Sequence, residues 1–203
     1  MYSECRSIFL LCSYFSTFMF VYSQKLLARH CPQVVPISDF DRDRYMGVWY
    51  QQAQFKSFLR EEVMCKHVVY KPVGENGFRL EARMLARVLN GPVSIYGVAK
   101  PVRPSNDLTG EYVVTMFGEA TNEDISYNIL FTDYDRISIV WSCDSFYKLW
   151  SKQNIQVLTR DRKMNSTTLL ASTLKTLLPQ QLDHYLDLLS PIDQSECEEI
   201  LPQ

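Results

Sequence analysis

The cysteines are the first residues of this sequence to consider for chemistry. Two of the six, Cys5 and Cys12, lie within the first 23 residues, and four lie beyond them. These four are Cys31, Cys65, Cys143 and Cys197. An even number of cysteines in a secreted chain predicts two disulfides, for which three pairings are open. None of the four lies close enough to another in sequence to form the CxxC pair of a zinc site.

The other candidates for catalysis form no constellation. The histidines His30, His67 and His184 are scattered, and neither G-x-S-x-G nor H-E-x-x-H occurs. With all four cysteines paired, no thiol nucleophile would remain. We therefore expect a protein that is not an enzyme and that needs no cofactor.

Three aspartates spaced two apart, from Asp39 to Asp43, raise the question of a calcium site. An EF-hand loop needs glycine at its sixth position and glutamate at its twelfth. In a loop that begins at Asp39, those positions hold Arg44 and Tyr50. We expect a solvated helical turn here, and no metal site.

Charge and composition describe an ordinary globular chain that is rich in aromatic residues. The 203 residues carry a net charge of −2, which gives no electrostatic footprint for nucleic acid. They include 12 tyrosines, 11 phenylalanines and 3 tryptophans. Tyrosine and phenylalanine favour strands and also line apolar pockets.

Residues 7–23 form an uncharged apolar run that is short for a membrane span. Val21 and Ser23 fit the small-residue rule for cleavage after Ser23. We predict a signal peptide over residues 1–23 and one secreted, extracellular domain over residues 24–203. An uncleaved membrane anchor is the alternative. In a secretory setting the sequon Asn165-Ser166-Thr167 is a predicted glycosylation site.

The elements that must position these residues are strands. Segments of strand-like composition are joined by short polar turns, such as the one at Asn76-Gly77. The segments span residues 48–55, 63–73, 78–88, 93–102, 111–117, 125–132, 137–143 and 155–160. Eight strands, mostly linked as hairpins, predict an all-β fold that is an antiparallel barrel or a sandwich.

One helix is predicted after the strands, over residues 166–178. Ser166 or Thr167 can cap its start, and Pro179 stops it. Its apolar stripe consists of Leu170, Leu174 and Leu178, with Leu169 and Leu177 beside them. We expect this stripe to pack on the bulky face of the strand 137–143. That face consists of Ile137, Ile139 and Trp141.

Three spaced motifs resemble the signature regions of the lipocalins. They are Gly47-Val48-Trp49-Tyr50, Thr132-Asp133-Tyr134 and Arg160. Further matches resemble the apolipoprotein D branch, which includes many invertebrate members. They are Cys31-Pro32, Val140-Trp141-Ser142-Cys143 and the segment 191–197. The resemblance covers about residues 31–200. It implies an eight-stranded antiparallel up-and-down barrel, the calyx, with one C-terminal α-helix packed outside.

In the family that these motifs resemble, the signature residues are structural. Gly47 would let the chain enter the barrel closely, Trp49 would close the barrel floor, and Arg160 would stack on Trp49. The turn Thr132-Asp133-Tyr134 would likewise be structural. The cysteine pattern of the family implies the disulfides Cys31–Cys143 and Cys65–Cys197.

The resemblance also implies a carrier of one small hydrophobic ligand, such as a fatty acid, sterol, retinoid, carotenoid or bilin. Strand parity, anchored on Trp49 and Arg160 pointing inward, predicts the ligand-binding residues. They are Gln51, Ala53, Phe55, Val68, Tyr70, Leu80, Ala82, Ile95, Tyr112, Val114, Met116, Tyr127, Ile129, Phe131, Val140, Gln156 and Leu158, with Val93 and Ser138 on the same faces. The predicted polar groups that orient the ligand are Tyr112, Tyr127 and Gln156. Gln156 stands where apolipoprotein D itself has an aromatic residue. His67 falls on the outward face, which argues against haem ligation.

Two other functions are compatible with the same fold. One is a protein-binding or signalling lipocalin whose calyx is filled by its own side chains. The other is a lipocalin enzyme that acts on a lipid. As partners we expect the small ligand and no nucleic acid. The apolar loop with Phe58-Leu59 and Val63-Met64 would touch membranes or lipoproteins during ligand exchange, or form a lid on the calyx.

Overall fold

The computed structural model describes most of the chain that follows the predicted signal peptide. The described residues are 25–27, 30–55, 63–86, 89, 91–103, 109–117, 124–146, 150–195 and 197. The predicted signal peptide and the Phe58-Leu59 loop lie outside them. Within the described ranges, no helix is both long and apolar enough to cross a membrane.

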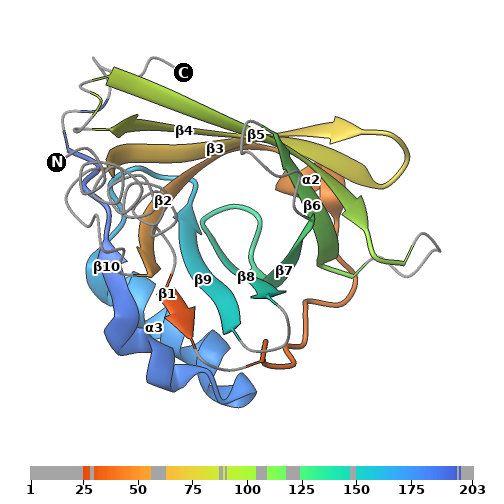
Figure 1. The fold of residues 1–203 in the computed structure, drawn as a ribbon. Helices are drawn as coiled ribbons and strands as arrows, with labels where there is room; N and C mark the ends of the chain where they lie inside the picture. The colour runs from red at the N-terminus through yellow and green to blue at the C-terminus, as the bar shows by residue number, and fades with distance from the viewer. Residues whose placement is uncertain are drawn as a thin grey trace, which may run out of the picture.

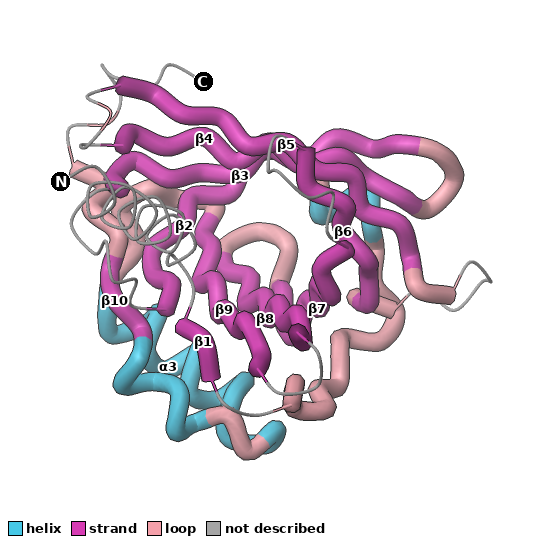
Figure 2. Tube along the Cα trace, in the orientation of Figure 1, coloured by secondary structure: helices cyan, strands magenta, loops and turns pink. Residues whose placement is uncertain are grey.

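The strands form one closed antiparallel barrel (Figures 1 and 2). They are β1 (Lys25–Leu27), β2 (Gly47–Phe55), β3 (Val63–Val73), β4 (Gly77–Ala86), β5 (Gly91–Pro101), β6 (Glu111–Phe117), β7 (Asp124–Thr132), β8 (Ile137–Phe146), β9 (Trp150–Thr159) and β10 (Leu189–Pro191). Strands β2 to β9 pair in sequence order, and the pairing of β2 with β9 closes the circle. The prediction of an eight-stranded antiparallel barrel is confirmed, with β1 added beside β9 and β10 beside β2.

The β3–β4 hairpin requires glycine at two positions, for two different physical reasons. Gly74 has a φ of +62°, which favours glycine because it has no Cβ. Gly77 does not share this conformation, but a Cβ there would lie 2.8 Å from the carbonyl oxygen of Ala99. The turn was predicted at Asn76-Gly77 on the strength of positive φ. The turn is present, but the positive φ belongs to Gly74, and Gly77 is required by close packing instead.

The helical segments lie outside the barrel or at one end of it (Figure 1). They are α2 (Arg42–Tyr45), α3 (Ser166–Leu177), and the 3-10 helices η1 (Leu178–Gln180) and η2 (Asp183–Leu188). Asp41 caps α2 by accepting a hydrogen bond from the amide of Arg44. Asn165, one residue before the predicted caps, is the N-cap of α3, and its Oδ1 accepts from the amides of Thr167 and Thr168.

Part of the predicted stripe of α3 faces the barrel and part does not. Leu177 is buried in the exterior core and Leu169 packs against it, as predicted. Leu170, Leu174 and Leu178 are instead 59%, 40% and 57% exposed. The following segment, η2, returns across the barrel wall and places Tyr185 beside Trp141, with ring centroids 5.2 Å apart. The bulky face of β8 is therefore covered by Leu177 and Tyr185 together.

Two apolar cores result, one on each side of the barrel wall. The interior core fills the barrel around Trp49 and Phe78, and the exterior core packs α3 and η2 on the outside of β8 and β9. Two disulfides, Cys31–Cys143 and Cys65–Cys197, join residues 112 and 132 positions apart, as predicted. Loops of this length give each disulfide about 4–5 kcal/mol of stabilisation in the chain-entropy model.

Candidate functional site

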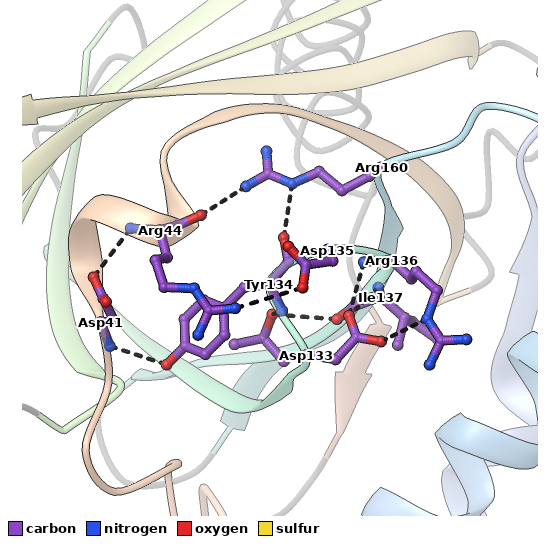
Figure 3. Close-up of polar contacts among 9 residues, drawn as sticks. Asp41, Arg44, Asp133, Tyr134, Asp135, Arg136, Ile137 and Arg160 are labelled. Carbon is purple, nitrogen blue, oxygen red and sulfur yellow. Dashed lines mark hydrogen bonds and ion pairs between the residues drawn. The ribbon is translucent and has the colours of Figure 1, made fainter.

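The closed end of the barrel is built around Arg160. Its guanidinium carbon lies 4.0 Å from the centre of the Trp49 ring. The same guanidinium donates hydrogen bonds to the carbonyl oxygens of Arg44, Tyr45, Met46, Val48 and Tyr134, at 2.8–3.1 Å. Figure 3 shows Arg160 reaching Arg44 on one side and Tyr134 on the other. Gly47 has a φ of +99°, and a Cβ there would lie 3.2 Å from Arg160 Nη1, so glycine is needed beside the guanidinium.

The turn before β8 is held by its own aspartate (Figure 3). Asp133 Oδ1 accepts from the amides of Arg136 and Ile137, each at 2.8 Å. Burial alone would raise the pKa of Asp133, but these amides and the Arg136 side chain outweigh it and lower the pKa. Tyr134, at φ +67°, accepts a hydrogen bond on its hydroxyl from the amide of Asp41. The polar groups of this turn are thus paired with one another.

Aromatic rings fill the barrel just above this closed end. The ring of Phe78 lies 4.7 Å from that of Tyr112, and Tyr45 lies 5.1 Å from both Trp49 and Tyr70. The Tyr45 hydroxyl is hydrogen-bonded to Ser138 Oγ at 2.9 Å. Burial raises the pKa of Tyr112 to about 12. This end of the barrel is therefore a packed floor.

A cavity of about 150 Å³ lies inside the barrel beyond the floor. Many of the residues selected by strand parity line it. They are Gln51, Val68, Tyr70, Leu80, Ala82, Ile95, Val114, Met116, Tyr127 and Gln156. The hydroxyls of Tyr70 and Tyr127 are hydrogen-bonded to each other at 2.6 Å, and burial raises both pKa values well above 10.

Other predicted lining residues belong to the interior core without reaching the cavity. Tyr112, Ile129, Val140 and Leu158 pack there, and Val93 packs against that core from its edge. Ser138 is buried at the floor beside Tyr45. The prediction that Tyr112 orients a ligand is therefore corrected, because its ring packs on Phe78 as part of the floor.

Ala53, Phe55 and Phe131 lie outside the cavity because two strands carry an extra residue. In β2 the register with β9 shifts between Gln51 and Ala53, which turns Ala53 and Phe55 outward into the exterior core. In β7 the register with β8 shifts between Ile129 and Phe131, and Phe131 is left 36% exposed. One extra residue exchanges the two faces of a strand, so these three predictions were wrong.

Ser142 lines the cavity from the face of β8 that also carries Ser138 and Val140, as sequence alternation predicts. Sequence reasoning missed five further residues of the cavity lining. They are Gln54, Lys66, Met84, Ile125 and Asn154. Continued strand parity would have found most of them: Lys66 alternates with Val68, Met84 with Ala82, and Asn154 with Gln156. Gln54 had no such signal, because the β2 shift alone turns it inward.

The polar lining residues meet in one corner of the cavity. Lys66 Nζ donates to Gln54 Oε1 at 3.0 Å, and Gln51 Nε2 donates to the same oxygen at 3.0 Å. Gln51 Oε1 is buried and accepts no hydrogen bond from the described residues. Desolvation lowers the pKa of Lys66 from 10.5 to about 8. We call Gln51, Gln54 and Lys66 the polar corner.

The histidine of β3 takes no part in the cavity. His67 Nδ1 lies 3.2 Å from the carbonyl oxygen of Cys65, and its ring is 6.1 Å from that of Tyr50. Desolvation lowers the pKa of His67. Across the described residues, no group of three or more His, Cys, Asp or Glu side chains is placed to hold a metal ion.

Comparison with known proteins identifies relatives of the chain. No family model matches the chain. The bilin-binding protein of Pieris brassicae is 26% identical over 140 residues, which are 66% of this chain and 71% of that protein. Apolipoprotein D of Cavia porcellus is 26% identical over 181 residues, which are 84% of this chain and 86% of that protein.

Among solved structures, insecticyanin from Manduca sexta shares the fold. Its TM-score is 0.67 at 22% sequence identity, and the match covers 86% of this chain and 91% of that one. The closed barrel, the Trp49–Arg160 stack, the two disulfides and these relatives agree with one another. The chain has the lipocalin fold, and its sequence is similar to those of the bilin-binding protein and apolipoprotein D.

Proposed function

We propose that this protein is a secreted carrier that holds one small hydrophobic ligand inside its barrel. The observation that carries the proposal is the interior cavity, which is enclosed by the strands and separated from the exterior core. A cavity with apolar walls and a few converging polar groups is the usual form of a small-molecule site.

The mechanism is partition between water and the cavity. Apolar ligand surface removed from water contributes about 25 cal/mol per Å². The apolar wall is supplied by residues such as Leu80, Ile95 and Val114, and Tyr127 and Gln156 are the proposed orienting groups that reach the cavity. The other predicted lining residues that reach the cavity belong to the same proposed site.

The relatives support this class of function. One is named for binding a bilin, and it covers about two thirds of this chain. The proposed ligands are therefore those of the family resemblance: a fatty acid, sterol, retinoid, carotenoid or bilin. The four cysteines Cys31, Cys65, Cys143 and Cys197 are all paired, which leaves none of them as a thiol nucleophile and supports a carrier over an enzyme.

Two features support an extracellular location. Disulfides persist mainly in oxidising compartments. The sequon asparagine Asn165 is exposed, and its cap uses only the side-chain oxygen Oδ1, so a glycan on Nδ2 leaves the cap in place. We therefore propose Asn165 as a glycosylation site of the secreted chain.

Contact with membranes or lipoproteins during ligand exchange is a separate proposal. It rests on the apolar sequence of the β2–β3 connection, of which Val63 and Met64 are described. Val63 packs against the interior core, and Met64 packs beside the Cys65–Cys197 disulfide. Flotation with liposomes tests the idea, and a Phe58→Asp variant that floats as well as the wild type would exclude it.

A second candidate function has one observation in its favour. The floor is filled by the protein's own rings, and the cavity of about 150 Å³ is small beside the roughly 300–1,000 Å³ of common ligand pockets. A lipocalin with so little interior space would act through its outer surface, as a protein-binding or signalling protein.

Native mass spectrometry distinguishes the small-molecule carrier from the protein-binding alternative. The mature chain, residues 24–203, would be secreted from a eukaryotic cell and weighed before and after organic extraction. A carrier should show an extractable adduct of a small molecule, or should take one up when fatty acids, retinoids and bilins are offered. A clean mass that resists all three would favour the protein-binding alternative.

A further inference from the structure

We propose that Lys66 sets the class of ligand: the cavity takes an anionic amphiphile whose carboxylate pairs with the Lys66 ammonium. The apolar part of this ligand lies against the wall formed by β4, β5, β6 and β7. The inference rests on the proposed carrier function and narrows it from any small hydrophobic molecule to a carboxylate.

The lining of the cavity has two sides. Its polar members come from β2, β3, β8 and β9, and they are Gln51, Gln54, Lys66, Ser142, Asn154 and Gln156. On β4, β5 and β6 every lining residue is apolar, and β7 adds Ile125 beside the hydroxyl of Tyr127. A ligand that is polar at one end and apolar along its body matches this division.

Among the described residues that line the cavity, Lys66 is the one with a formally charged side chain, and none of them carries a carboxylate. Its recorded partner is the neutral oxygen of Gln54, which already accepts from Gln51. Burying an ammonium without a counter-ion is unfavourable, and the lowered pKa of Lys66 has that cause. An anionic head group would supply the missing charge and accept the remaining ammonium hydrogens.

Gln51 gives an independent sign of a polar ligand atom in the same corner. Its side chain is fully buried and lines the cavity. Its Oε1 accepts no hydrogen bond from the part of the chain that the structure describes. Buried polar atoms are rarely left unpaired, so a ligand atom, or a water bound with it, is expected at this oxygen.

The backbone that carries Lys66 is fixed from outside the barrel. Two residues of β3, Cys65 and Lys66, stand opposite the single residue Met84 of β4, and Cys65 adopts a φ of +58°. This bulge is braced by the Cys65–Cys197 disulfide and by the Cys65 amide, which donates to Asp193 O at 2.8 Å. A lysine in a braced bulge is held ready for its ligand.

Gln194 completes the brace and ties it to the polar corner. Its Nε2 donates to the carbonyl oxygen of Lys66 at 2.7 Å and to that of Gln51 at 2.8 Å. Two residues of the corner are therefore anchored to one side chain of the C-terminal segment. These two hydrogen bonds hold the backbones of Lys66 and Gln51 beside each other.

The test compares two probes of the same length, dodecanoate and dodecanol, on the full mature chain by calorimetry or competition. Three variants accompany the wild type. Lys66→Met keeps an unbranched chain without charge, Lys66→Arg keeps the charge, and Lys71→Met removes an exposed lysine from the same strand as a control. Melting curves establish that each variant folds.

We expect the wild type to bind dodecanoate about tenfold more tightly than dodecanol, as one net charge-assisted contact predicts. In Lys66→Met this ratio should fall to about one while dodecanol affinity stays the same. Lys66→Arg and Lys71→Met should keep the preference. A Lys66→Met protein that still prefers dodecanoate, or a wild type without preference, would overturn the role of Lys66 and leave the carrier standing. Binding of neither probe to the wild type would count against both.

Discussion

The two ends of the barrel interior treat their polar groups in opposite ways. At the floor, the Arg160 guanidinium makes five hydrogen bonds to carbonyl oxygens and stacks on Trp49, and Asp133 is satisfied by amides of its own turn. In the polar corner, Lys66 shares one neutral acceptor with Gln51, whose own oxygen is unpaired among the described residues. Satisfied polar groups serve the fold, whereas unsatisfied ones in a cavity leave bonding capacity for a ligand.

The largest loss of stability should come from Arg160→Ala, which removes the side chain at the centre of the floor. Five carbonyl oxygens would each lose a hydrogen bond and Trp49 would lose its stacking partner, so the free energy of unfolding should fall by about 3–4 kcal/mol. Urea unfolding measures it. Arg136→Ala is the matched control, because Arg136 bonds the same turn from an exposed position and should cost about 0–1 kcal/mol. Equal losses in the two variants would remove the distinction between a structural floor and a solvated surface.

The two disulfides allow the brace of the polar corner to be separated from stability. Replacing Cys65 and Cys197 with serine should cost about 2–5 kcal/mol, and the same change at Cys31 and Cys143 should cost a similar amount, since both close long loops. The first pair should also weaken the preference for dodecanoate over dodecanol, because it braces the bulge at Lys66.

The second pair belongs to a different cluster: Cys143 is part of the exterior core, and Cys31 packs against it. Its loss should leave the preference for dodecanoate unchanged once the protein is folded. If both pairs changed the preference equally, the effect would be one of overall stability and the brace would have no specific role.

The floor was largely predictable from the sequence, and the polar corner was not. Gly47, Trp49 and Arg160 form motifs whose contacts follow from their residue types. The cavity depends on which face each strand turns inward, and parity carries that information only until a strand gains a residue. The shifts after Gln51 and Ile129 turned Phe55 and Phe131 outward, and no local composition marks them, because a bulge is fixed by pairing with the neighbouring strand.

Prediction from residue spacing has the same limit for helix α3, which packs on the outside of the barrel. Spacing alone places five leucines of α3 in one apolar stripe. Of these, Leu169 and Leu177 pack on the exterior core, whereas η2 and Tyr185 occupy the part of the barrel wall that the other three would need.

Removing the unpaired group of the corner should affect stability far less than breaking the floor. In Gln51→Met the buried oxygen without a partner disappears together with one hydrogen bond to Gln54. We expect the free energy of unfolding to change by less than about 1 kcal/mol, since the lost bond and the relieved oxygen offset each other. A loss as large as that of Arg160→Ala in the same urea titration would mean that Gln51 serves the fold.

The last comparison concerns how the free energy of unfolding depends on pH. The pKa of Lys66 is 10.5 in its unperturbed state and about 8 in the folded protein, so the unfolded chain binds the extra proton between these values. Stability therefore rises with pH across this window, and the unfavourable contribution of the buried ammonium is fully present below pH 8. Lys66→Met should lack this rise, which urea unfolding at pH 7, 9 and 10 can detect as a difference between two profiles.

The tyrosines of the cavity do not affect the difference between the pH profiles of wild type and Lys66→Met. Tyr70 and Tyr127 have pKa values raised well above 10 by burial, and they are present in both proteins, so their contribution cancels. Saturating dodecanoate should abolish the rise in the wild type, because a paired carboxylate keeps the Lys66 ammonium protonated in the folded state. If the free energy of unfolding of wild type and of Lys66→Met changed with pH in parallel without ligand, the Lys66 ammonium would already be solvated. The polar corner would then resemble the protein surface and would not be a site that lacks a counter-ion.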